Sequence, residues 1–430
     1  MKIRVPGDKS LTQRALIFAA LADGESRLSG LLPGGDAAST AAALRLLGAE
    51  VGPLPPNGEE LRVRGLGLHG LSTPAAPLDL GNSGTGTRLL LGVLAGSNVV
   101  AEVSGDASLR SRPMARVTEP LGRMGAGFDF LERPHRLPLR VTGKRPLAPL
   151  EWESPVSSAQ VKSALLLAGV TGGAFVLLTE PRQSRDHTER LLAQAGVSLV
   201  CHASGPGWRV ELRDPPERLL PLDFAVPGDA SSAAFFLALA ALGGVGEGID
   251  IEGVGLNPTR TGYLGLFRRM GAEVAVIPQG PSGPGEPAGT LVGLTSTLKG
   301  ITVTPDEVPG VIDELPLVAV LAARAEGETR ITGAEELRHK ESDRIATVVA
   351  NLRAVGVEAE ELADGLVVRG SDRPLSGRVV THGDHRIAMA FGVLGALADN
   401  RIDVDDPDAA DVSFPGFWTL LRQVRVQGGA

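Results

Sequence analysis

The chain has 430 residues, of which 43% are hydrophobic and 21% charged, a composition typical of a soluble globular protein with two or more domains. Its net charge of −8 argues against a general nucleic-acid-binding protein, and its single cysteine, Cys201, excludes an intrachain disulfide and a cysteine-based metal cage. The opening stretch "MKIRVPGDKS" lacks the apolar core of a signal peptide, and no run approaches the roughly 18 apolar residues of a spanning helix. We therefore expect a cytoplasmic protein without a membrane partner.

The first predicted helix follows the stretch "PGDKSLTQR", residues 6–14. Lys9, Ser10 and Arg14 stand there just before the apolar run "ALIFAALA". Free N–H groups and the helix dipole make a helix start attractive to anions. Because the stretch lacks the G-x-x-x-x-G-K-[ST] frame of a P-loop, we predict an anion site of another kind.

This pattern of a polar cap, an Ala/Leu-rich helix, a glycine and a strand recurs six times along the chain. Its markers are spaced about 71 to 83 residues apart and are Ser10, Ser83, Ser158, Ser231, Glu314 and His385. A second pattern of helix, glycine and strand lies between them, at Gly48, Gly125, Gly196, Gly271 and Gly356. Both series lengthen at "PQGPSGPGEPAGT", residues 278–290, which we interpret as a surface excursion.

The chain is therefore predicted to contain six copies of an α/β repeat of about 73 residues each. The first helix of each repeat is apolar nearly all round and should be buried. The second, such as "DHTERLLAQAG", is amphipathic and should cover the outside. These patterns do not choose between one ring of six repeats and two groups of three.

The starts of the buried helices carry most of the residues with functional chemistry. Hydrogen-bond donors and cations gather at five of the six starts: Lys9, Ser10 and Arg14; Asn82, Ser83, Thr85 and Arg88; Ser157, Ser158, Gln160 and Lys162; Ser231 and Ser232; His385 and Arg386. The segments "RSRPM" and "RHKESDR" add Arg112, Arg338, Lys340, Glu341, Asp343 and Arg344. Cations at positively polarised helix starts are unfavourable unless an anion binds there, so we predict a site for a polyanionic small molecule.

Each of these features has a simpler interpretation. The serines and Asn82 are ordinary helix caps in that view, "RHKESDR" is a solvated charged helix, and "NSGTGT" is a flexible turn. Their recurrence at equivalent repeat positions favours the anion site.

The fifth helix start differs, because "VIDELP" places Asp313 and Glu314 where the others have donors. A carboxylate among cations stays ionised at neutral pH, which suits a general base. Glu341 would be the complementary acid if its surroundings were drier. The alternative for Asp313 is a simple helix N-cap.

These residues resemble a known family. The segments "PGDKSLTQRAL", "LGNSGTGTR", "RSRPM", "SSAQVKSALLLAG", "RDHTE", "PGDASSAAF", "KESDRI" and "GDHRIAMAF" are similar, in order and over nearly the whole chain, to 5-enolpyruvylshikimate-3-phosphate synthases, the 3-phosphoshikimate 1-carboxyvinyltransferases. "SAQVKSA" and "RDHTE" resemble the second, bacterial branch of the family.

The resemblance implies an α/β fold of two globular domains, each of three repeats, with buried helices that point their N-termini into the interdomain cleft. Residues 1–7 and 227–430 would form domain I, and residues 8–226 would form domain II. A monomer is expected on the family alone.

The resemblance also implies the reaction. The enolpyruvyl group of phosphoenolpyruvate would pass to the 5-hydroxyl of shikimate 3-phosphate by addition and elimination, with release of phosphate, in aromatic amino acid biosynthesis. No metal or organic cofactor and no nucleic-acid partner are expected. Glyphosate inhibits the family in competition with phosphoenolpyruvate, and Gly84 stands where some tolerant members of the second branch carry alanine, so we predict a glyphosate-sensitive enzyme.

The family motifs assign roles to individual residues. Catalysis would fall to Asp313 as the base, Glu341 as the proton donor to C3, and Lys9. Shikimate 3-phosphate would be bound by Lys9, Ser10, Arg14, Ser157, Ser158, Gln160, Arg185, Asp313 and Lys340. Phosphoenolpyruvate would be bound by Lys9, Asn82, Gly84, Thr85, Arg112, Gln160, Arg344 and Arg386.

The chain departs from the family pattern at two positions. Many members have a second serine where this chain has Ala159, and others have a lysine where it has Val412, which puts one phosphate contact in doubt. One rival interpretation is the sister transferase acting on UDP-N-acetylglucosamine, which has Lys-Asn at Lys9-Ser10 and uses a cysteine in a mobile loop, whereas Cys201 follows a predicted strand. The other is a non-catalytic repeat protein that binds anions or RNA.

Overall fold

The computed structural model describes residues 1–56, 58–280 and 285–428. The chain separates into two compact domains, each described here by itself. Of the described residues, domain I comprises Met1–Pro6, 227–280 and 287–428, and domain II comprises Gly7–Val226 together with Gly285 and Glu286. The expected boundary placed Gly7 in domain I. The structure places it against Gly30, whose carbonyl oxygen would lie 1.9 Å from a Cβ at Gly7, so a side chain has no room there.

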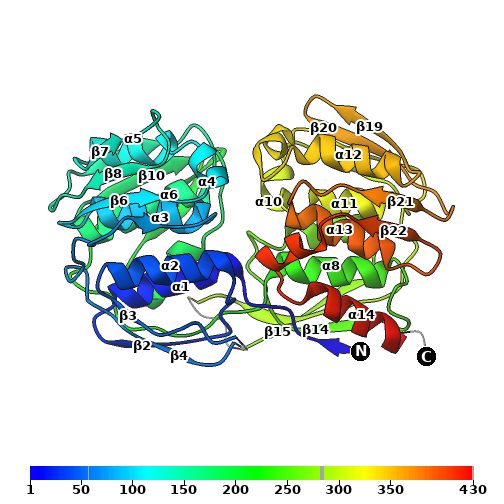
Figure 1. Ribbon diagram of the computed structural model, residues 1–430, viewed down its shortest axis with the longest axis horizontal. Coiled ribbons are helices and arrows are strands. Elements are labelled where there is room, and N and C mark those ends of the chain that lie inside the picture. Colours follow the sequence, from blue (N-terminus) through cyan, green and yellow to red (C-terminus); the bar gives the residue numbers. More distant parts are fainter. Residues whose placement is uncertain (57, 281–284, 429–430) are drawn as a thin grey trace. The chain divides into compact units, whose positions relative to one another are not determined.

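Three helices that are buried nearly all round form the centre of domain II (Figure 1). They are α1 (Lys9–Leu21), α3 (Gly84–Ala95) and α6 (Ala159–Gly172). Helices that are buried on one side follow them: α2 (Gly35–Leu46), the short α4 (Ala107–Ser111), α5 (Ala115–Arg123) and α7 (His187–Gln194). This division matches the predicted alternation of apolar and amphipathic helices, because only a helix with an apolar surface all round can be enclosed by its neighbours.

The sheets of domain II repeat one plan, in which a parallel pair of strands is followed by two antiparallel additions. In sheet order the strands are β13 (Asp223–Ala225), β2 (Glu25–Ser29), β4 (Leu61–Arg64) and β3 (Glu50–Val51); β5 (Leu78–Asp79), β6 (Val100–Ser104), β8 (Leu139–Thr142) and β7 (Gly127–Phe130); β9 (Leu150–Glu153), β10 (Val176–Glu180), β12 (Gly207–Leu212) and β11 (Val200–Ser204). Strand β4 shows the alternation that covers one face, since Leu61 and Val63 are buried and Arg62 and Arg64 are exposed.

Domain I is built in the same way. Its buried helices are α8 (Ala230–Ala241), α11 (Leu315–Ala322) and α13 (His385–Gly395), and its other helices are α9 (Gly262–Arg269), α10 (Val308–Val311), η1 (Glu335–His339), α12 (Arg344–Ala354), η2 (Pro407–Val412) and α14 (Phe417–Gly428). Its sheets are β1 (Lys2–Ile3), β14 (Ile249–Gly255), β16 (Ala288–Gly293) and β15 (Val274–Gln279); β17 (Thr302–Val303), β18 (Glu328–Ile331), β20 (Gly365–Arg369) and β19 (Glu358–Leu362); and the parallel pair β21 (Ser376–Val379) and β22 (Arg401–Val404).

The sixth repeat is incomplete, which the predicted sixfold repetition did not anticipate. Within the described residues it keeps the buried helix α13 and one parallel strand pair, and it lacks the antiparallel strands of the other five. The chain continues instead into η2 and α14, where Phe414 and Phe417 pack on Phe236 with ring centroids 5.7 and 5.8 Å apart. Aromatic rings from the C-terminal segment thus close the core of domain I at this place.

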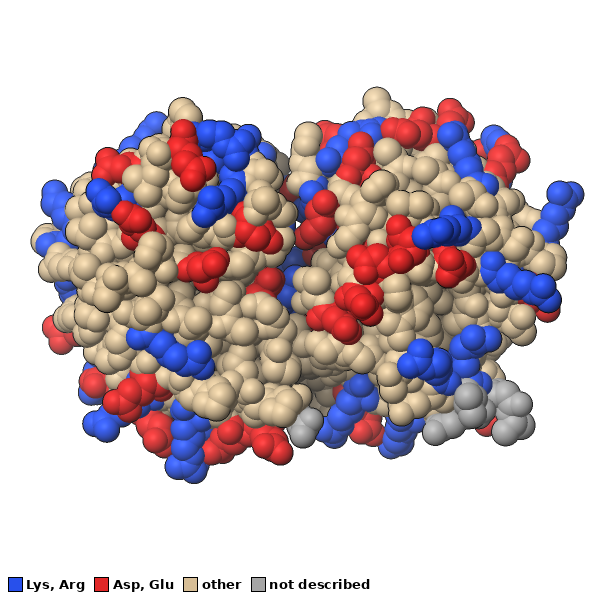
Figure 2. Space-filling model, in the orientation of Figure 1, with Lys and Arg blue, Asp and Glu red and all other residues tan. Residues whose placement is uncertain are grey.

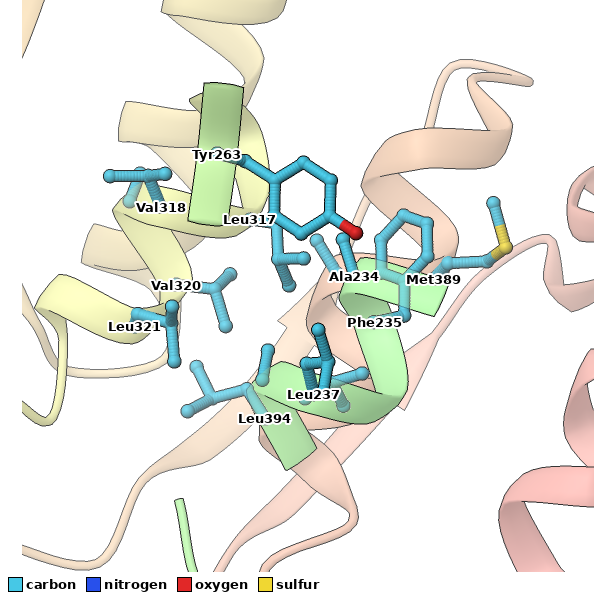
Figure 3. Packing of buried hydrophobic residues seen from close by; sticks show 14 of the residues in the cluster. Ala234, Phe235, Leu237, Tyr263, Leu317, Val318, Val320, Leu321, Met389 and Leu394 are labelled. Atoms are coloured by element: carbon cyan, nitrogen blue, oxygen red, sulfur yellow. The ribbon is translucent and has the colours of Figure 1, made fainter. Parts of the chain in front are cut away.

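Figure 3 shows how the three buried helices of domain I meet. Leu237 of α8, Leu321 of α11 and Leu394 of α13 belong to one buried hydrophobic cluster, and Tyr263 of α9 joins it from the side. The side chains are mostly Ala, Val and Leu, as the low aromatic content of the chain requires. The predicted α/β repeat fold is confirmed. The predicted excursion at 278–290 includes residues 281–284, which lie outside the described residues.

Glycine allows two of the buried helices of domain II to approach closely. A Cβ at Gly92 of α3 would lie 2.2 Å from the carbonyl oxygen of Ala164 of α6, far inside van der Waals contact. The closeness of the two backbones leaves no volume for a side chain at this position.

We expect Gly92→Ala to lower the free energy of unfolding by roughly 1–3 kcal/mol, because the added methyl must push α3 from α6. The measurement is urea unfolding followed by circular dichroism. Gly122→Ala in α5 is the matched control, since a Cβ there meets nothing within 4 Å, and it should be neutral or slightly stabilising. Equal midpoints for the wild type and Gly92→Ala would contradict the close approach.

Candidate functional site

The starts of the buried helices are fixed by side-chain caps. A carboxylate or hydroxyl oxygen accepts a backbone N–H of the first turn at Asp8 of α1, Ser83 of α3, Ser158 of α6, Asp229 of α8 and Asp384 of α13. Ser83 and Ser158 thus serve as ordinary caps. Helix α11 differs, because its N-cap residue is Glu314, which makes no side-chain cap bond. The alternative that Asp313 is the cap of this helix is therefore wrong.

The first turns of the three buried helices meet in domain II. Gln13 Nε2 of α1 donates to Ser83 Oγ at 2.9 Å, which joins α1 to the cap of α3. Gln160 Nε2 of α6 donates to Thr85 Oγ1 of α3, also at 2.9 Å. Three helix starts therefore place their polarised N–H ends in one region, as the sequence predicted for an anion site.

Arg14 lies beneath this region and not on its surface. Its guanidinium is buried, donates from Nε to Thr188 Oγ1 at 2.9 Å and from Nη2 to Ser163 Oγ at 3.0 Å, and also donates to Ser10. Burial lowers the pKa of Arg14 to about 10, although the carboxylates of Asp8 and Glu189 oppose that shift. Arg14 thus supplies positive charge and holds the Ser10 hydroxyl in place.

Lys9 is paired with a carboxylate that the sequence did not single out. Its Nζ lies 3.3 Å from Oδ2 of Asp36, in the first turn of α2. In sequence, Asp36 looks like an acidic residue that favours the helix dipole. Only the folded chain shows that it also orients Lys9.

A pair of arginines surrounds the start of α3. A Cβ at Gly84 would lie 3.0 Å from Nη1 of Arg112 and 3.0 Å from Nη1 of Arg88. Arg112 donates to Asn82 Oδ1, and Arg88 Nη1 donates to Gln160 Oε1 at 2.8 Å. Burial and the positive charge of Arg112 lower the pKa of Arg88 to about 10. Two guanidiniums held side by side at a helix start repel one another, and a bound anion would relieve that repulsion.

Hydrogen bonds tie the segment that carries Arg185 to the start of α6. Ser157 Oγ donates to the backbone oxygen of Arg182 at 2.8 Å and accepts from its backbone nitrogen at 2.9 Å. Arg185 is close enough to Arg14 for its charge to contribute to the lowered pKa of Arg14. Ser158 and Arg185 therefore stand on the same side of domain II as Arg14.

Lys162 does not belong to the anion site. Its ammonium is fully buried and lies 2.9 Å from Glu180 and 2.8 Å from Glu189, and it donates to the Ser184 backbone oxygen at 3.1 Å. A buried ammonium held by two carboxylates is a structural ion group. Its position in the first turn of α6 suggested a role at the helix start. Its side chain instead contacts Glu180 of β10 and Glu189 of α7.

The polar cluster of domain I is centred on Asp313. Its carboxylate is 15% exposed and faces three guanidiniums, with Oδ2 3.6 Å from Arg260 and 3.5 Å from Arg386, and Oδ1 3.8 Å from Arg344. Arg386 also donates from Nη1 to the backbone oxygen of Asp313 at 3.0 Å. Three positive charges around one carboxylate favour its ionised form.

Arg344 is buried and bidentate. Its Nε donates to Asp384 Oδ2 at 2.8 Å, and its Nη2 donates to Asp384 Oδ1 at 3.2 Å and to Glu341 Oε2 at 2.6 Å. Burial opposes the charged guanidinium, but Asp384 and Glu341 outweigh that effect and raise the pKa of Arg344. Burial likewise acts to raise the pKa of Asp384, but Arg344 prevails and lowers it. Glu341 remains about one third exposed.

The segment "RHKESDR" bends and is not one solvated helix, so that alternative is wrong. Residues Glu335–His339 form η1, and a new helix, α12, starts after the capping residue Asp343. Arg338 holds the bend by donating to Asp343 at 2.8 Å and to Glu361 at 2.9 Å. Lys340 lies 3.2 Å from Glu336 at the surface.

The sequence predictions missed Arg260 and the partners of Glu314. Ser231 Oγ donates to Glu314 Oε1, and Arg260 Nη2 donates to Ser231 Oγ at 2.9 Å. Burial raises the pKa of Glu314, although Arg260 and Arg386 oppose this. Arg260 lies in "NPTRTG", outside the helix starts, and its sequence neighbours give no sign of a role.

The two departures from the family pattern lie at element ends. Ala159 opens α6 directly after its cap, and Val412 ends η2 with an exposed side chain. Cys201 lies on strand β11, as expected, and not in a loop. In the described part of the chain, no group of three or more His, Cys, Asp or Glu side chains is arranged to hold a metal ion, and no described helix has the length and apolar character to cross a membrane.

The Arg344–Asp384 pair leads to a prediction about stability and pH. Asp384→Asn should lower the free energy of unfolding at neutral pH by about 3–5 kcal/mol, because it leaves a buried guanidinium without its main carboxylate. The folded-state pKa of Asp384 is lowered, so its contribution is present above the unfolded pKa and is lost as the pH falls through the folded value.

Urea unfolding at about pH 7 and about pH 3 tests this prediction. The difference between wild type and variant should shrink at the lower pH. Glu358→Gln, which removes an exposed partner of Arg369, is the control and should change stability little at either pH. A difference that persists unchanged in acid would contradict the assigned charge pair.

The chain is similar to known proteins over nearly its whole length. The family model described as EPSP synthase (3-phosphoshikimate 1-carboxyvinyltransferase) matches residues 1–421. The 3-phosphoshikimate 1-carboxyvinyltransferase of Acidiphilium cryptum is 46% identical over 422 residues, which cover 98% of this chain and 94% of that protein. That of Alkalilimnicola ehrlichii is 47% identical over 431 residues, with 99% and 93% covered.

Solved structures agree with these relatives. The structure of EPSP synthase from Acinetobacter baumannii superposes with a TM-score of 0.87 at 38% identity and covers 99% of this chain and 95% of that one. The enolpyruvyl transferase NikO from Streptomyces tendae superposes with a TM-score of 0.75 at 21% identity, with 100% and 95% covered, which shows a shared fold. The chain belongs to the EPSP synthase (3-phosphoshikimate 1-carboxyvinyltransferase) family.

Proposed function

We propose that this protein transfers the carboxyvinyl group of phosphoenolpyruvate to the 5-hydroxyl of shikimate 3-phosphate and releases phosphate, a step of aromatic amino acid biosynthesis. The observation that carries the proposal is the carboxylate of Asp313 among three arginines, in a chain of this family. That arrangement combines a base with groups that bind a substrate carboxylate. We further propose that the enzyme acts in the cytoplasm as a monomer.

Domain II would supply most of the groups for the phosphates. The start of α6, with Ser157, Ser158 and Arg185, would bind the phosphate of shikimate 3-phosphate, near Ser10 and the buried charge of Arg14. Arg185, whose charge acts on Arg14, would take the place of the second serine that many family members have where this chain has Ala159. The phosphate of phosphoenolpyruvate would be bound by a second set of residues around the start of α3: Asn82, Gly84, Thr85, Arg112 and Gln160. The side-by-side guanidiniums of Arg88 and Arg112 support this assignment.

Domain I would supply the chemistry. Arg344 and Arg386 would bind the phosphoenolpyruvate carboxylate, and Lys340 would bind shikimate hydroxyls. The 5-oxygen would attack C2 while its proton passes to Asp313 and C3 gains a proton from Glu341, giving a tetrahedral intermediate. Glu341, now a carboxylate, would then take a proton from the new methyl group, and the phosphate would leave with the proton held by Asp313, which restores the double bond. Lys9 would contact both substrates.

The ion pair between Glu341 and Arg344 affects the proposed proton transfer from Glu341 to C3 of phosphoenolpyruvate. A paired carboxylate seldom holds a proton that it could donate, because the guanidinium stabilises its ionised form. A substrate carboxylate that binds Arg344 would share that charge and weaken its effect on Glu341. Substrate binding would therefore raise the proton affinity of Glu341 at the time when a proton donor is needed.

The rival interpretations have less support. The sister transferase on UDP-N-acetylglucosamine uses a loop cysteine, and Cys201 lies on β11. Figure 2 shows lysine and arginine interspersed with aspartate and glutamate on the visible face of each domain, which does not favour an RNA-binding scaffold. Phosphate release that requires phosphoenolpyruvate and shikimate 3-phosphate together would establish the proposed reaction. Release with UDP-N-acetylglucosamine, or no release with either acceptor, would overturn it.

Asp313→Asn keeps the shape of the side chain and removes the base. We expect the turnover number to fall on the order of 10²–10⁴-fold, with shikimate 3-phosphate still bound. Phosphate release measures the first effect and calorimetry the second. Wild-type turnover in this variant would show that the base is another residue.

Gly84→Ala should affect inhibition by glyphosate more than catalysis. The added methyl would lie against the guanidiniums of Arg88 and Arg112, which must move into the space proposed for phosphoenolpyruvate. Glyphosate is longer than phosphoenolpyruvate, so its inhibition constant should rise roughly 10-fold or more, and the KM for phosphoenolpyruvate should rise less.

Inhibition of the wild type and the variant across a phosphoenolpyruvate titration tests this prediction. Gly122→Ala, an exposed helical glycine outside the cluster, is the control and should keep wild-type inhibition. Equal inhibition constants for wild type and Gly84→Ala, or a wild type that is already tolerant, would rule out this placement of Gly84.

A further inference from the structure

We propose that Arg260 is a positioning residue for Asp313, the proposed base. Arg260 holds the carboxylate of Asp313 in place and in its ionised form. This inference rests on the proposed function, because it concerns the base of that reaction. Arg260 lies outside the family segments in which the sequence placed functional residues. It acts through Asp313 and is not assigned a contact with substrate.

Arg260 is fixed on several sides. Its side chain is 5% exposed and donates from Nη2 to Ser231 Oγ at 2.9 Å; Nη2 lies 3.5 Å from Asp229 Oδ1, and Nη1 lies 3.6 Å from Asp313 Oδ2. Both Asp229 and Ser231 belong to the capped start of α8. The guanidinium therefore connects the start of α8 to the residue that precedes α11.

The backbone that carries Arg260 is also held. The residue lies in the turn between β14 and α9, where its N–H donates to the backbone oxygen of Asn257 at 2.9 Å. The side chain of Asn257 accepts from the backbone and hydroxyl of Thr259, which closes a side-chain-stabilised turn. A held backbone and a buried guanidinium suit a residue that must keep another side chain in position.

The other two arginines near Asp313 have different tasks. Arg344 is bound to Asp384 and Glu341, and both Arg344 and Arg386 are proposed to bind the substrate carboxylate. Once that carboxylate is bound, their charge is shared with it. Arg260, buried behind Asp313 against the start of α8, would continue to face the base throughout the reaction.

The remaining charged and titratable groups around Asp313 do not take over this role. Glu314 is the adjacent carboxyl, and burial raises its pKa, so it competes less for the charge of Arg260. Tyr263 of α9 lies near Arg260 and Asp229, and burial raises its pKa well above its ordinary value, so it stays neutral. Asp229 shares Arg260 with Asp313, but it also accepts the backbone N–H of Ser232 as the cap of α8.

The experiment compares phosphate release by Arg260→Met, Arg260→Lys and the wild type with both substrates from about pH 5 to about pH 9. Arg260→Met removes one of the cations beside Asp313, so the acid limb of kcat/KM should move to higher pH by about 1 unit or more. Turnover should be reduced most at low pH and should approach that of the wild type in alkali. Arg260→Lys retains the charge, so its acid limb should move by no more than about half of the shift expected for Arg260→Met.

Arg324→Met is the matched control. Arg324 is another arginine of domain I with buried atoms, and it donates to the backbone oxygens of Ser371 and Arg373 and to Asn400. Its loss should lower stability and leave the acid limb where it is. Because acid can unfold a destabilised variant, the folded fraction of each variant is followed by circular dichroism over the same pH range, and the acid limbs are compared only where both variants remain folded.

A double-mutant cycle assigns the effect to the base. In an Asp313→Asn background, Arg260→Met should change the remaining turnover by less than about 2-fold, because the group it acts on is gone. An acid limb of Arg260→Met at the wild-type position, or an undiminished effect of Arg260→Met in the Asp313→Asn background, would overturn the proposal. A wild type that releases no phosphate would instead overturn the proposed function.

Discussion

The choice of capping residue at each buried helix start decides where positive charge is balanced in this protein. In domain I the buried helices α8 and α13 are capped by aspartates that lie close to arginines: Asp229 to Arg260, and Asp384 to Arg344. In domain II, α1 is also capped by an aspartate, Asp8, but α3 and α6 are capped by Ser83 and Ser158, which are neutral. The arginines near α3 are therefore not offset by their caps, and an external anion meets a stronger positive field there.

Much of the fold follows from the pattern of the sequence. Helices that are apolar all round had to be enclosed, and their regular spacing predicted a repeated unit. One feature of the sequence indicates that the sixth repeat is incomplete. The second series of glycines ends at Gly356 and has no member after the sixth helix. The replacement of its antiparallel strands by an aromatic C-terminal segment depends on packing of Phe414 and Phe417 on α8, a long-range contact that periodicity does not contain.

The candidate site was predictable to the extent that function lies at helix starts. Recurrence picked out Lys9, Thr85 and Arg386, and the family motifs added Gly84. Asp36 and Arg260 escaped notice because their importance comes from tertiary partners. Lys162 was placed in the anion site because it lies in the first turn of α6. Sequence position shows on which turn of a helix a side chain lies, but neighbouring elements decide whether that side chain is buried. For Lys162 these elements are β10, which carries Glu180, and α7, which carries Glu189.

Charge balance in domain I also changes the picture of how a substrate would bind there. Arg344 and Arg386 already face protein carboxylates, so in the proposed scheme a substrate carboxylate would have to exchange partners with Asp313 and Glu341. Such an exchange weakens binding, since each arginine gives up one ion pair to form another. It also has a chemical consequence, because Asp313 loses part of the charge that held it and becomes a stronger base when the substrate arrives. A cation that stays with Asp313 during this exchange, as Arg260 does in the proposed scheme, limits the change and keeps the carboxylate ionised.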